Sequence, residues 1–132
     1  MDKAQFYHQF WSRFTWPAYD ESTVPGRNDD PNGTGSPDGT ALPYITYMVI
    51  EDEFEHPIYP SASLWTYGTS WATISQKVKE IYDYIGYGGR VESIDGGRVW
   101  VQRGHPFAQR VSDDNDMIRR IIINVDIEFM TG

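Results

Sequence analysis

The stretch IRRIIINVDIEF, residues 118–129, decides the fold of this chain. From Ile121 to Phe129 every second side chain is apolar, and Asn124, Asp126 and Glu128 fill positions between them. Successive side chains of a β-strand point to opposite faces of the sheet, so this alternation predicts one long strand with a buried face and a solvated face. Such a strand needs paired neighbours and a layer that covers its apolar face.

Two earlier segments predict neighbouring strands. Tyr44 to Ile50 is rich in aromatic and β-branched residues but lacks clean alternation, which is typical of a strand covered on both faces. Ile58 to Thr66 predicts a second strand, antiparallel to the first, and Pro60 predicts an edge or a bulge there because proline has no amide donor. The charged segment between them, Glu51 to His56, is expected to form the turn.

A further pair of strands is predicted from a short glycine-containing turn. Val91–Ile94 and Val99–Val101 flank Asp95-Gly96-Gly97, a combination that is typical of a β-hairpin. Arg103 to Asp116 follows neither the helical nor the strand period, so we expect this segment to be irregular.

Residues 3–15 predict the first helix. Its aromatic side chains recur on two adjacent stripes and make an apolar face wider than about 100°, which is expected to cover the sheet. The helix is expected to end before Pro17, because the residue that precedes a proline is pushed out of the helical region. The first stripe holds Phe6, Phe10 and Phe14, and the second holds Tyr7 and Trp11.

Residues 70–85 predict a second helix, which Thr69 or Ser70 begins and Gly86 ends. Its charged side chains are expected to lie off the apolar face, which would leave them in solvent. The apolar face holds Trp71, Ile74, Val78, Ile81 and Ile85, and the charged residues off it are Lys77, Lys79, Glu80 and Asp83.

The order of these elements predicts the α+β class. We expect residues 1–132 to form one domain with a single mostly antiparallel sheet of about five strands and two helices packed on one face. A Gly/Pro/Asp-rich loop at 24–43 interrupts the domain. Because it is long and poor in apolar side chains, we expect it to be flexible or to become ordered on a partner.

Composition narrows the classes of function. The chain has 132 residues with 19 acidic and 11 basic side chains, and its net charge of −8 disfavours nucleic-acid binding because it repels phosphate backbones. It has no cysteine, which excludes disulfides and thiolate metal sites. The absence of cysteine also fits a reducing compartment such as the cytosol. We find no secretory signal and no apolar run near the roughly 20 residues of a membrane span, so we expect no membrane partner.

Few residues combine into a recognisable chemical site. Glu53, Glu55 and His56 are of types that bind divalent ions, but we prefer to interpret them as a solvated turn between strands. The loop at 28–39 begins like a calcium loop but has Gly39 where a bidentate glutamate is required, which leaves only weak cation binding open. No nucleophile motif of the GxSxG type is present. We therefore expect no catalytic residue, no resident metal and no cofactor.

Arginines gather late in the chain. The candidate subunit-interface residues are Arg103, Arg110, Arg119 and Arg120. A planar guanidinium pairs with a carboxylate through two hydrogen bonds, and identical neighbours would each offer 19 acids. Ordinary solvation of the arginines is the alternative.

Several short motifs follow one another from Pro43 to the closing strand. They are Pro43–Tyr47, Ser63–Trp65, Ser70-Trp71, Gly86–Gly89, Arg103–Gln109 and Arg119–Phe129. In this order the motifs resemble those of the tail-terminator family of siphophages, whose members are also described as minor tail, capsid or head-tail joining proteins.

The resemblance implies a virion subunit of the tail or neck that is assembled in the host cytoplasm. The implied subunit belongs to a six-membered ring that caps the tail tube, stops its polymerisation and offers a surface for head-tail joining. Its implied partners are further copies of the chain, the major tail tube protein and the head-tail connector protein. DNA would pass through the bore without specific binding, and the family brings no catalytic residues.

Other functions stay open at this point. One is a head-tail connector or tail-completion subunit. From another class come a small metal-dependent enzyme that uses Glu53, Glu55 and His56, and a host binding module that uses the aromatic surface.

Overall fold

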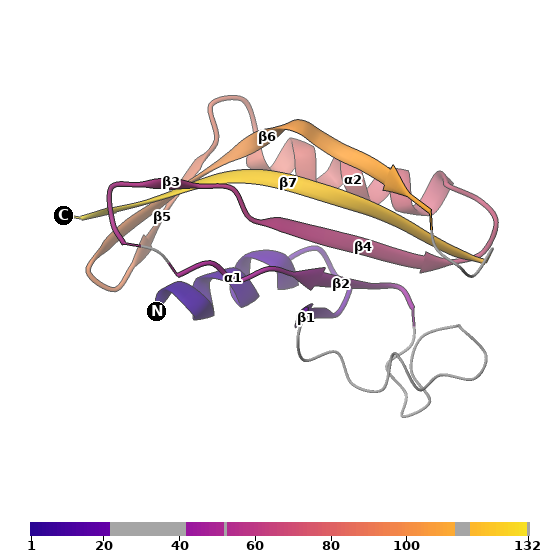
Figure 1. Cartoon of the computed structure of the whole chain (residues 1–132), viewed down its shortest axis with the longest axis horizontal. Helices are drawn as coiled ribbons and strands as arrows, with labels where there is room; N and C mark the ends of the chain where they lie inside the picture. Colours follow the sequence, from indigo (N-terminus) through magenta and orange to yellow (C-terminus); the bar gives the residue numbers. More distant parts are fainter. Residues whose placement is uncertain (22–41, 52, 113–116, 132) are drawn as a thin grey trace.

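The computed structural model describes residues 1–21, 42–51, 53–112 and 117–131. The predicted loop at 24–43 therefore lies outside the described residues except for Leu42 and Pro43, as does the calcium-like segment at 28–39. The elements in chain order are α1 (Lys3–Ser12), β1 (Ala18–Asp20), β2 (Tyr44–Tyr47), β3 (Pro57–Ile58), β4 (Ser61–Tyr67), α2 (Ala72–Ile85), β5 (Arg90–Ile94), β6 (Gly97–Val111) and β7 (Ile118–Thr131) (Figure 1).

The predicted α+β class is confirmed, and the sheet is mixed. The described residues form a sheet of seven strands. Six of them lie in the order β1-β2-β4-β7-β6-β5, and the seventh, β3, pairs with β7. All described pairings are antiparallel except β1 with β2, which is parallel. Sequence reasoning missed β1, because a three-residue strand is too short to show a period. It also joined β3 to β4, which the backbone separates around Pro60.

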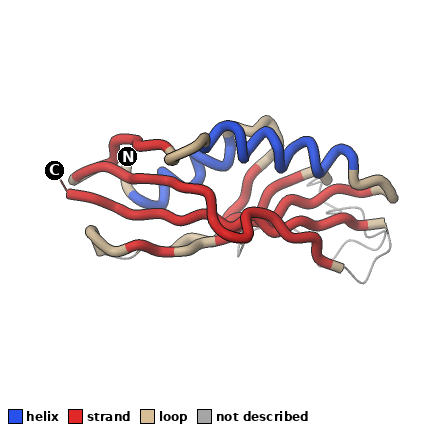
Figure 2. The backbone as a smooth tube through the Cα atoms, turned by 90° about the horizontal axis from the view of Figure 1, so that it is seen from above, coloured by secondary structure: helices blue, strands red, loops and turns tan. Residues whose placement is uncertain are grey.

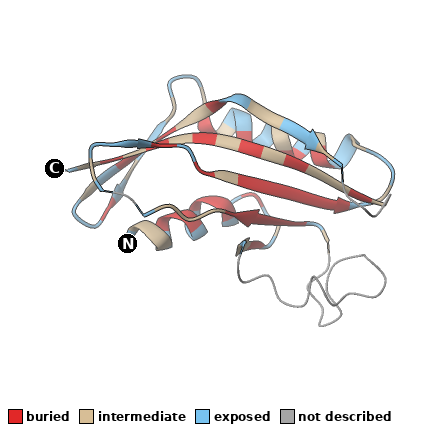
Figure 3. Ribbon diagram, in the orientation of Figure 1, coloured by how far each residue is buried: buried red, intermediate tan, exposed pale blue. Residues whose placement is uncertain are grey.

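Strand β7 lies at the centre of the sheet and follows its predicted alternation. Ile121, Ile123, Val125, Ile127 and Phe129 are buried, and the residues between them are half-buried. Figure 3 shows this alternation along β7, whereas β4 beside it is buried almost throughout. The register pairs β7 with β4 on one side and with β6 on the other, so Ala62 and Leu64 of β4 and Val99 and Val101 of β6 share the face of the buried β7 residues.

Both helices pack against that face. Figure 2 shows α2 running along one side of the strands, and one apolar core contains residues of α1, α2 and β7. The helices also contact each other, since the Tyr84 ring of α2 lies 6.0 Å from the Phe10 ring of α1, between ring centroids. The predicted aromatic stripes of α1 are confirmed, because Phe6 and Phe10 are buried with the other three aromatic residues.

Strand β2 is shorter than predicted. It ends at Tyr47 rather than Ile50, although its four residues are buried on both faces as expected. Val49 and Ile50 pack against the core instead, and the Ile50 carbonyl accepts a hydrogen bond from the Tyr7 hydroxyl at 2.7 Å. Packing against α1 therefore replaces sheet pairing for a segment whose composition favours a strand.

The prediction that Arg103–Asp116 is irregular is wrong over most of this segment. Strand β6 continues to Val111, with a register shift against β7 between Arg103 and Ala108. A side chain at Gly104 would come within 2.5 Å of the Asn124 carbonyl oxygen, and the Asn124 amide donates to the Pro106 carbonyl at 2.9 Å. The bulge hides the strand period from the sequence, because it breaks the alternation in the middle of the strand.

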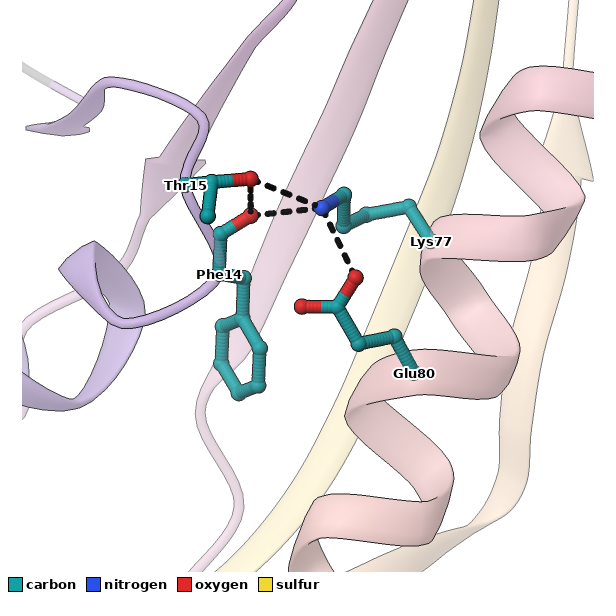
Figure 4. Close-up of polar contacts among 4 residues, drawn as sticks. All are labelled: Phe14, Thr15, Lys77 and Glu80. Carbon is teal, nitrogen blue, oxygen red and sulfur yellow. Dashed lines mark hydrogen bonds and ion pairs between the residues drawn. The ribbon is translucent and has the colours of Figure 1, made fainter.

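Helix α2 also corrects a prediction, since Lys77 is buried rather than solvated. Its ammonium donates to the Phe14 carbonyl at 2.5 Å, to the Thr15 hydroxyl at 3.2 Å and to Glu80 at 2.9 Å (Figure 4). These contacts hold the turn after α1, where Thr15 has a φ of 69° that β-branched residues rarely adopt. Lys77 therefore ties α2 to the turn that follows α1.

The helix ends are partly as expected. α1 ends at Ser12, and it begins with a capping box in which Asp2 and Gln5 each bond the other's backbone amide. α2 begins at Ala72, whose amide donates to the Ser70 hydroxyl at 3.0 Å. Gly86 ends α2 as predicted, with a φ of 78° but a ψ of 169° in place of the expected left-handed helical conformation.

Candidate functional site

One edge of the sheet is left open along half of β6. Strand β5 pairs with β6 only from Gly97 to Val101, and the remaining residues of β6 pair with β7 alone among the described strands. An open edge presents backbone donors and acceptors to a further strand or to another chain. The open part begins at Gln102, and the register shift of β6 against β7 follows between Arg103 and Ala108.

A hollow of about 320 Å³ lies beside the start of this open edge. Its walls are Tyr82 of α2, the turn Gly86–Gly89, and Gln102–His105 with Phe107 from β6. The hollow therefore forms where the end of α2 meets the bulged strand. A space of this size accommodates an amino-acid side chain or a small ligand.

The glycine turn shapes one wall of the hollow. A side chain on Gly89 would come within 2.3 Å of the Val101 carbonyl oxygen, so only glycine permits this approach of the turn to β6. The Trp100 indole donates to the Gly88 carbonyl at 2.9 Å and holds the turn against the strand. Tyr87, between these glycines, is 100% exposed at the rim.

Arg103 supplies a fixed positive charge. Its Nε and Nη2 donate to the Tyr82 carbonyl at 3.0 and 2.9 Å, and its guanidinium carbon lies 3.3 Å from the centroid of the Tyr82 ring. The Tyr82 ring in turn packs edge-on against Phe107, with 5.2 Å between centroids. Two hydrogen bonds and a ring contact restrict the guanidinium, so it is pre-organised to bind an anion.

The lining of the hollow differs in charge from the rest of the chain. Arg103 and His105 belong to the lining and no aspartate or glutamate does, although the chain has 19 acidic residues. Asp126 is the cross-strand partner of Gln102 but is not part of the lining. The hollow is thus a local cationic and aromatic site on an acidic protein.

The other candidate arginines lie elsewhere. Arg110 and Arg119 lie over the Trp71 ring, with guanidinium carbons 4.4 and 5.4 Å from its centroid. Trp71 immediately precedes α2 and lies eleven positions before Tyr82, which corresponds to about 16 Å along a helix. The structure therefore brings Arg110 and Arg119 together but places Arg103 at a different site.

Arg120 lies on the opposite face of the sheet from the helices. Its Nε donates to the Ser63 hydroxyl at 3.1 Å, and its guanidinium carbon lies 4.5 Å from the Trp65 ring centroid. Arg119 also makes contacts within the chain, since its Nε and Nη2 donate to the Thr69 carbonyl at 3.3 and 3.2 Å. The four predicted residues thus occupy three separate places on the molecule.

The acidic turn does not gather into a metal site. The His56 imidazole lies 3.9 Å from a Glu53 oxygen, whereas the Glu55 carboxylate accepts from the Thr131 amide at 2.9 Å and from its hydroxyl at 2.8 Å. These hydrogen bonds lower the pKa of Glu55 below its ordinary value. Within the described ranges, no group of three or more His, Asp or Glu side chains is arranged to hold a metal ion.

Sequence reasoning identified Arg103 but not the hollow that it lines. A signal was present in Gly86-Tyr87-Gly88-Gly89, because an aromatic residue among glycines cannot be buried by the turn that carries it. The bulge that brings Gln102 to Phe107 against this turn is visible only in three dimensions.

The fold and this surface define an α+β protein with an open sheet edge and a preformed cationic hollow. Comparison with protein-family models, with curated proteins and with solved structures finds no match to the chain. None of the helices in the described residues is long and apolar enough to cross a membrane.

Proposed function

We propose that this chain is a non-catalytic assembly subunit of a phage virion, which forms a ring, caps the tail tube and stops its polymerisation. The ring would offer its outer surface for head-tail joining. The observation that carries the proposal is the open edge of β6 beside a hollow with a fully exposed tyrosine. Natural proteins cover or blunt open edges, and exposed aromatic groups mark contact surfaces, so both features favour a neighbouring chain.

A ring requires two different surfaces on each subunit. Head-to-tail contacts between unlike surfaces close into a ring when the rotation between neighbours permits it. The sheet has unlike ends, with the short β1 at one end and β5 and the open half of β6 at the other. The resemblance of the motifs from Pro43 onward to tail terminators favours six subunits. The net charge of −8 also fits a bore through which DNA passes without binding, because like charges repel.

A head-tail connector or tail-completion subunit would use the same surfaces. The two roles differ in partner, because a terminator binds the tip of the tail tube and a connector binds the head. We favour the terminator role because the motifs of the chain resemble that family. No group of His, Asp and Glu side chains within the described residues favours a metal-dependent enzyme. A host binding module would use the same exposed aromatic residues, and we favour the virion role over it because of the resemblance.

The first test is the mass of the protein in solution, measured by light scattering over a range of concentrations with and without magnesium. A six-fold species that also binds the tips of tail tubes and limits their length is the expected result. A monomer that neither assembles nor binds tail tubes would overturn the proposal. Binding to heads alone would instead identify a connector.

We predict that charge reversal of Arg119 or Arg120 blocks assembly. Each residue also donates a hydrogen bond within its own chain, so these variants can lose stability as well. Arg110 is exposed and stacks only on Trp71 among the described residues, so Arg110→Glu tests the same end of α2 with less effect on the fold. Thermal unfolding of each variant separates lost contacts between subunits from lost stability.

A further inference from the structure

We propose that the open edge of β6 and the hollow beside it bind one ligand, an acidic extended segment of a different protein. The segment adds as a further strand along Ala108–Val111, and a carboxylate side chain of the same segment binds Arg103 in the hollow. The inference rests on the proposed function only in treating this edge as a contact surface, and it does not require the chain to form a ring.

The edge that receives the strand lies in line with β5. Strand β5 ends where Arg90 pairs with Val101, and the later residues of β6 pair with β7 alone among the described strands. From Ala108 to Val111 four consecutive residues pair with β7 in continuous register, so this part of β6 is regular strand. Pro106 has no amide donor, but it lies inside the register shift and not in this regular part. A partner strand therefore finds continuous backbone to pair with.

The hollow begins where the regular edge ends. Phe107 belongs to its lining and Ala108 begins the regular part of the edge, so a chain added on the edge continues past the register shift into the hollow. Arg103 is held there by two hydrogen bonds to the Tyr82 carbonyl, and it donates to no other described residue. His105 is exposed and adds imidazole nitrogens, whereas the lining contains no aspartate or glutamate. A fixed guanidinium with N–H groups left over binds a carboxylate through charge-assisted hydrogen bonds.

The aromatic rim favours a peptide over a free anion. Tyr87 is 100% exposed and Tyr82 is 40% exposed. A polypeptide that covers these rings removes apolar surface from water, which a small anion cannot do. Tyrosine and arginine also often dominate protein interfaces, where surrounding contacts exclude water from a central charge. Edge, cation and rim therefore fit the same ligand, since strand addition takes its affinity from the backbone and its specificity from side-chain pockets.

A second copy of this chain fits the edge less well than a different protein does. Within the described residues the sheet ends in β1 on one side and in β5 on the other, and these strands are the ones that a copy could add. Strand β1 has only three residues. Strand β5 already uses its carboxylate, because Glu92 forms an ion pair with Arg13 at 2.9 Å. The acidic strand is therefore assigned to another protein.

The test uses a synthetic peptide of about ten residues, close to the upper length of an ordinary strand. Valine and threonine alternate along it, a glutamate stands at both ends so that either strand direction is served, and its termini are blocked to remove their charges. One twin has glutamine in place of both glutamates. A second twin has N-methyl groups along its middle, which remove the donors that strand pairing needs. Fluorescence anisotropy of the labelled peptides measures their affinity for the full chain.

The peptide with glutamates should bind about tenfold more tightly than either twin, because each twin loses one of the two parts of the contact. Arg103→Gln should remove the preference for glutamate over glutamine. The exposed Arg98 lies on the β5–β6 hairpin, and Arg98→Gln is the matched control that should keep the preference. Tyr87→Ala, which removes a fully exposed side chain, should weaken binding by about threefold or more. Amide hydrogen exchange should slow on Ala108–Val111 when the peptide is bound.

Three results would overturn the inference. The first is no binding of the peptide at millimolar concentration, and the second is an Arg103→Gln variant that still prefers glutamate. The third is an N-methylated twin that binds as well as its parent, because the hollow then takes a carboxylate without strand addition.

The choice of partner and the ring proposal are tested separately from peptide binding. If exchange on Ala108–Val111 slows with rising protein concentration in the absence of peptide, a second copy occupies the edge and the inference is wrong. A chain that forms a ring and ignores the peptide contradicts the inference and leaves the ring proposal standing. A monomer that binds the peptide as expected supports the inference even if the ring proposal fails.

Discussion

Two cationic side chains, Lys77 of α2 and Arg103 of β6, donate hydrogen bonds to backbone carbonyl oxygens, yet they have different surroundings. Lys77 is buried and divides its ammonium among Phe14, Thr15 and Glu80 (Figure 4). Among the described residues Arg103 donates hydrogen bonds only to the Tyr82 carbonyl, and it lines the hollow. The comparison teaches that a charge with all its donors used inside the chain stabilises the fold, whereas a charge that is fixed but incompletely bonded is available to a partner.

The backbone around each cation follows the same division. Lys77 meets a turn in which a threonine adopts a positive φ, and its bonds help to hold that conformation. Arg103 lies opposite the turn Gly86–Gly89, in which Gly86, Gly88 and Gly89 adopt positive φ without strain and Tyr87 is fully exposed. The unfavourable backbone conformation of Thr15 is held in place by its contact with Lys77. The glycine turn, in contrast, leaves the Tyr87 side chain fully exposed.

The largest expected effect comes from the sheet on which both regions rest. Ile123→Asp should destabilise the protein by about 3–5 kcal/mol, because Ile123 is fully buried in β7 and an unpaired charge there has no partner. Ile122→Asp is the matched control, since Ile122 is half-buried on the opposite face and should cost much less. Urea unfolding followed by tryptophan fluorescence measures both. If both substitutions lower the free energy of unfolding equally, the assignment of Ile123 to the buried face of β7 is wrong.

A smaller effect tests the comparison directly. Lys77→Ala should lower the free energy of unfolding by about 2 kcal/mol, because it removes buried methylene groups and charge-assisted hydrogen bonds. Arg103→Ala should lower it by less than about 1 kcal/mol. Lys79→Ala, which removes an exposed pair with Asp83, is the control and should change stability by less than about 0.5 kcal/mol.

The two replacements at Lys77 and Arg103 are compared in the same unfolding assay. If Arg103→Ala lowers the free energy of unfolding as much as Lys77→Ala does, Arg103 mainly stabilises the fold. The proposed difference in role between the two cations is then wrong. Lys77→Met then separates the two causes at Lys77. Recovery of most of the lost stability by methionine would assign it to packing rather than to hydrogen bonds.

The smallest effect concerns Glu55 at the exposed turn. Its hydrogen bonds to Thr131 lower the pKa of the carboxyl in the folded state, so they add stability above the ordinary glutamate pKa. This contribution is lost as the pH falls through the lowered pKa of the folded protein. Wild type and Glu55→Gln should therefore differ slightly in thermal midpoint at neutral pH and converge in acid. A difference that persists in strong acid would contradict this assignment.

Periodic segments were predictable because their period reports directly which face is buried. The alternation in β7 and the aromatic stripes of α1 each correspond to observed burial. The hairpin of β5 and β6 was predictable from Asp95-Gly96-Gly97, because few other turns join strands so closely. Errors arose where contacts distant in sequence overrode local pattern: Lys77 is buried because the end of α1 supplies acceptors, and β6 runs through its bulge because β7 pairs with it on both sides of the shift.

The candidate site was predictable only in part. The sequence contains Arg103 and an aromatic residue within a glycine run, but nothing in it states that the two meet. They meet because the Trp100 indole and the Gly89 contact hold the turn against β6. The scatter of Arg103, Arg110, Arg119 and Arg120 over three places has the same origin, since register and strand facing are tertiary properties.

By itself the sequence determined the α+β class, the facing of β7, the aromatic face of α1 and the charge of −8, because period and composition act locally or by simple summation. Only the tertiary structure decided that β1 pairs in parallel with β2, that Lys77 is buried and that the open edge of β6 adjoins a hollow without acids. The physical reason is that pairing, burial and cavities depend on which distant segments fill the space around a residue.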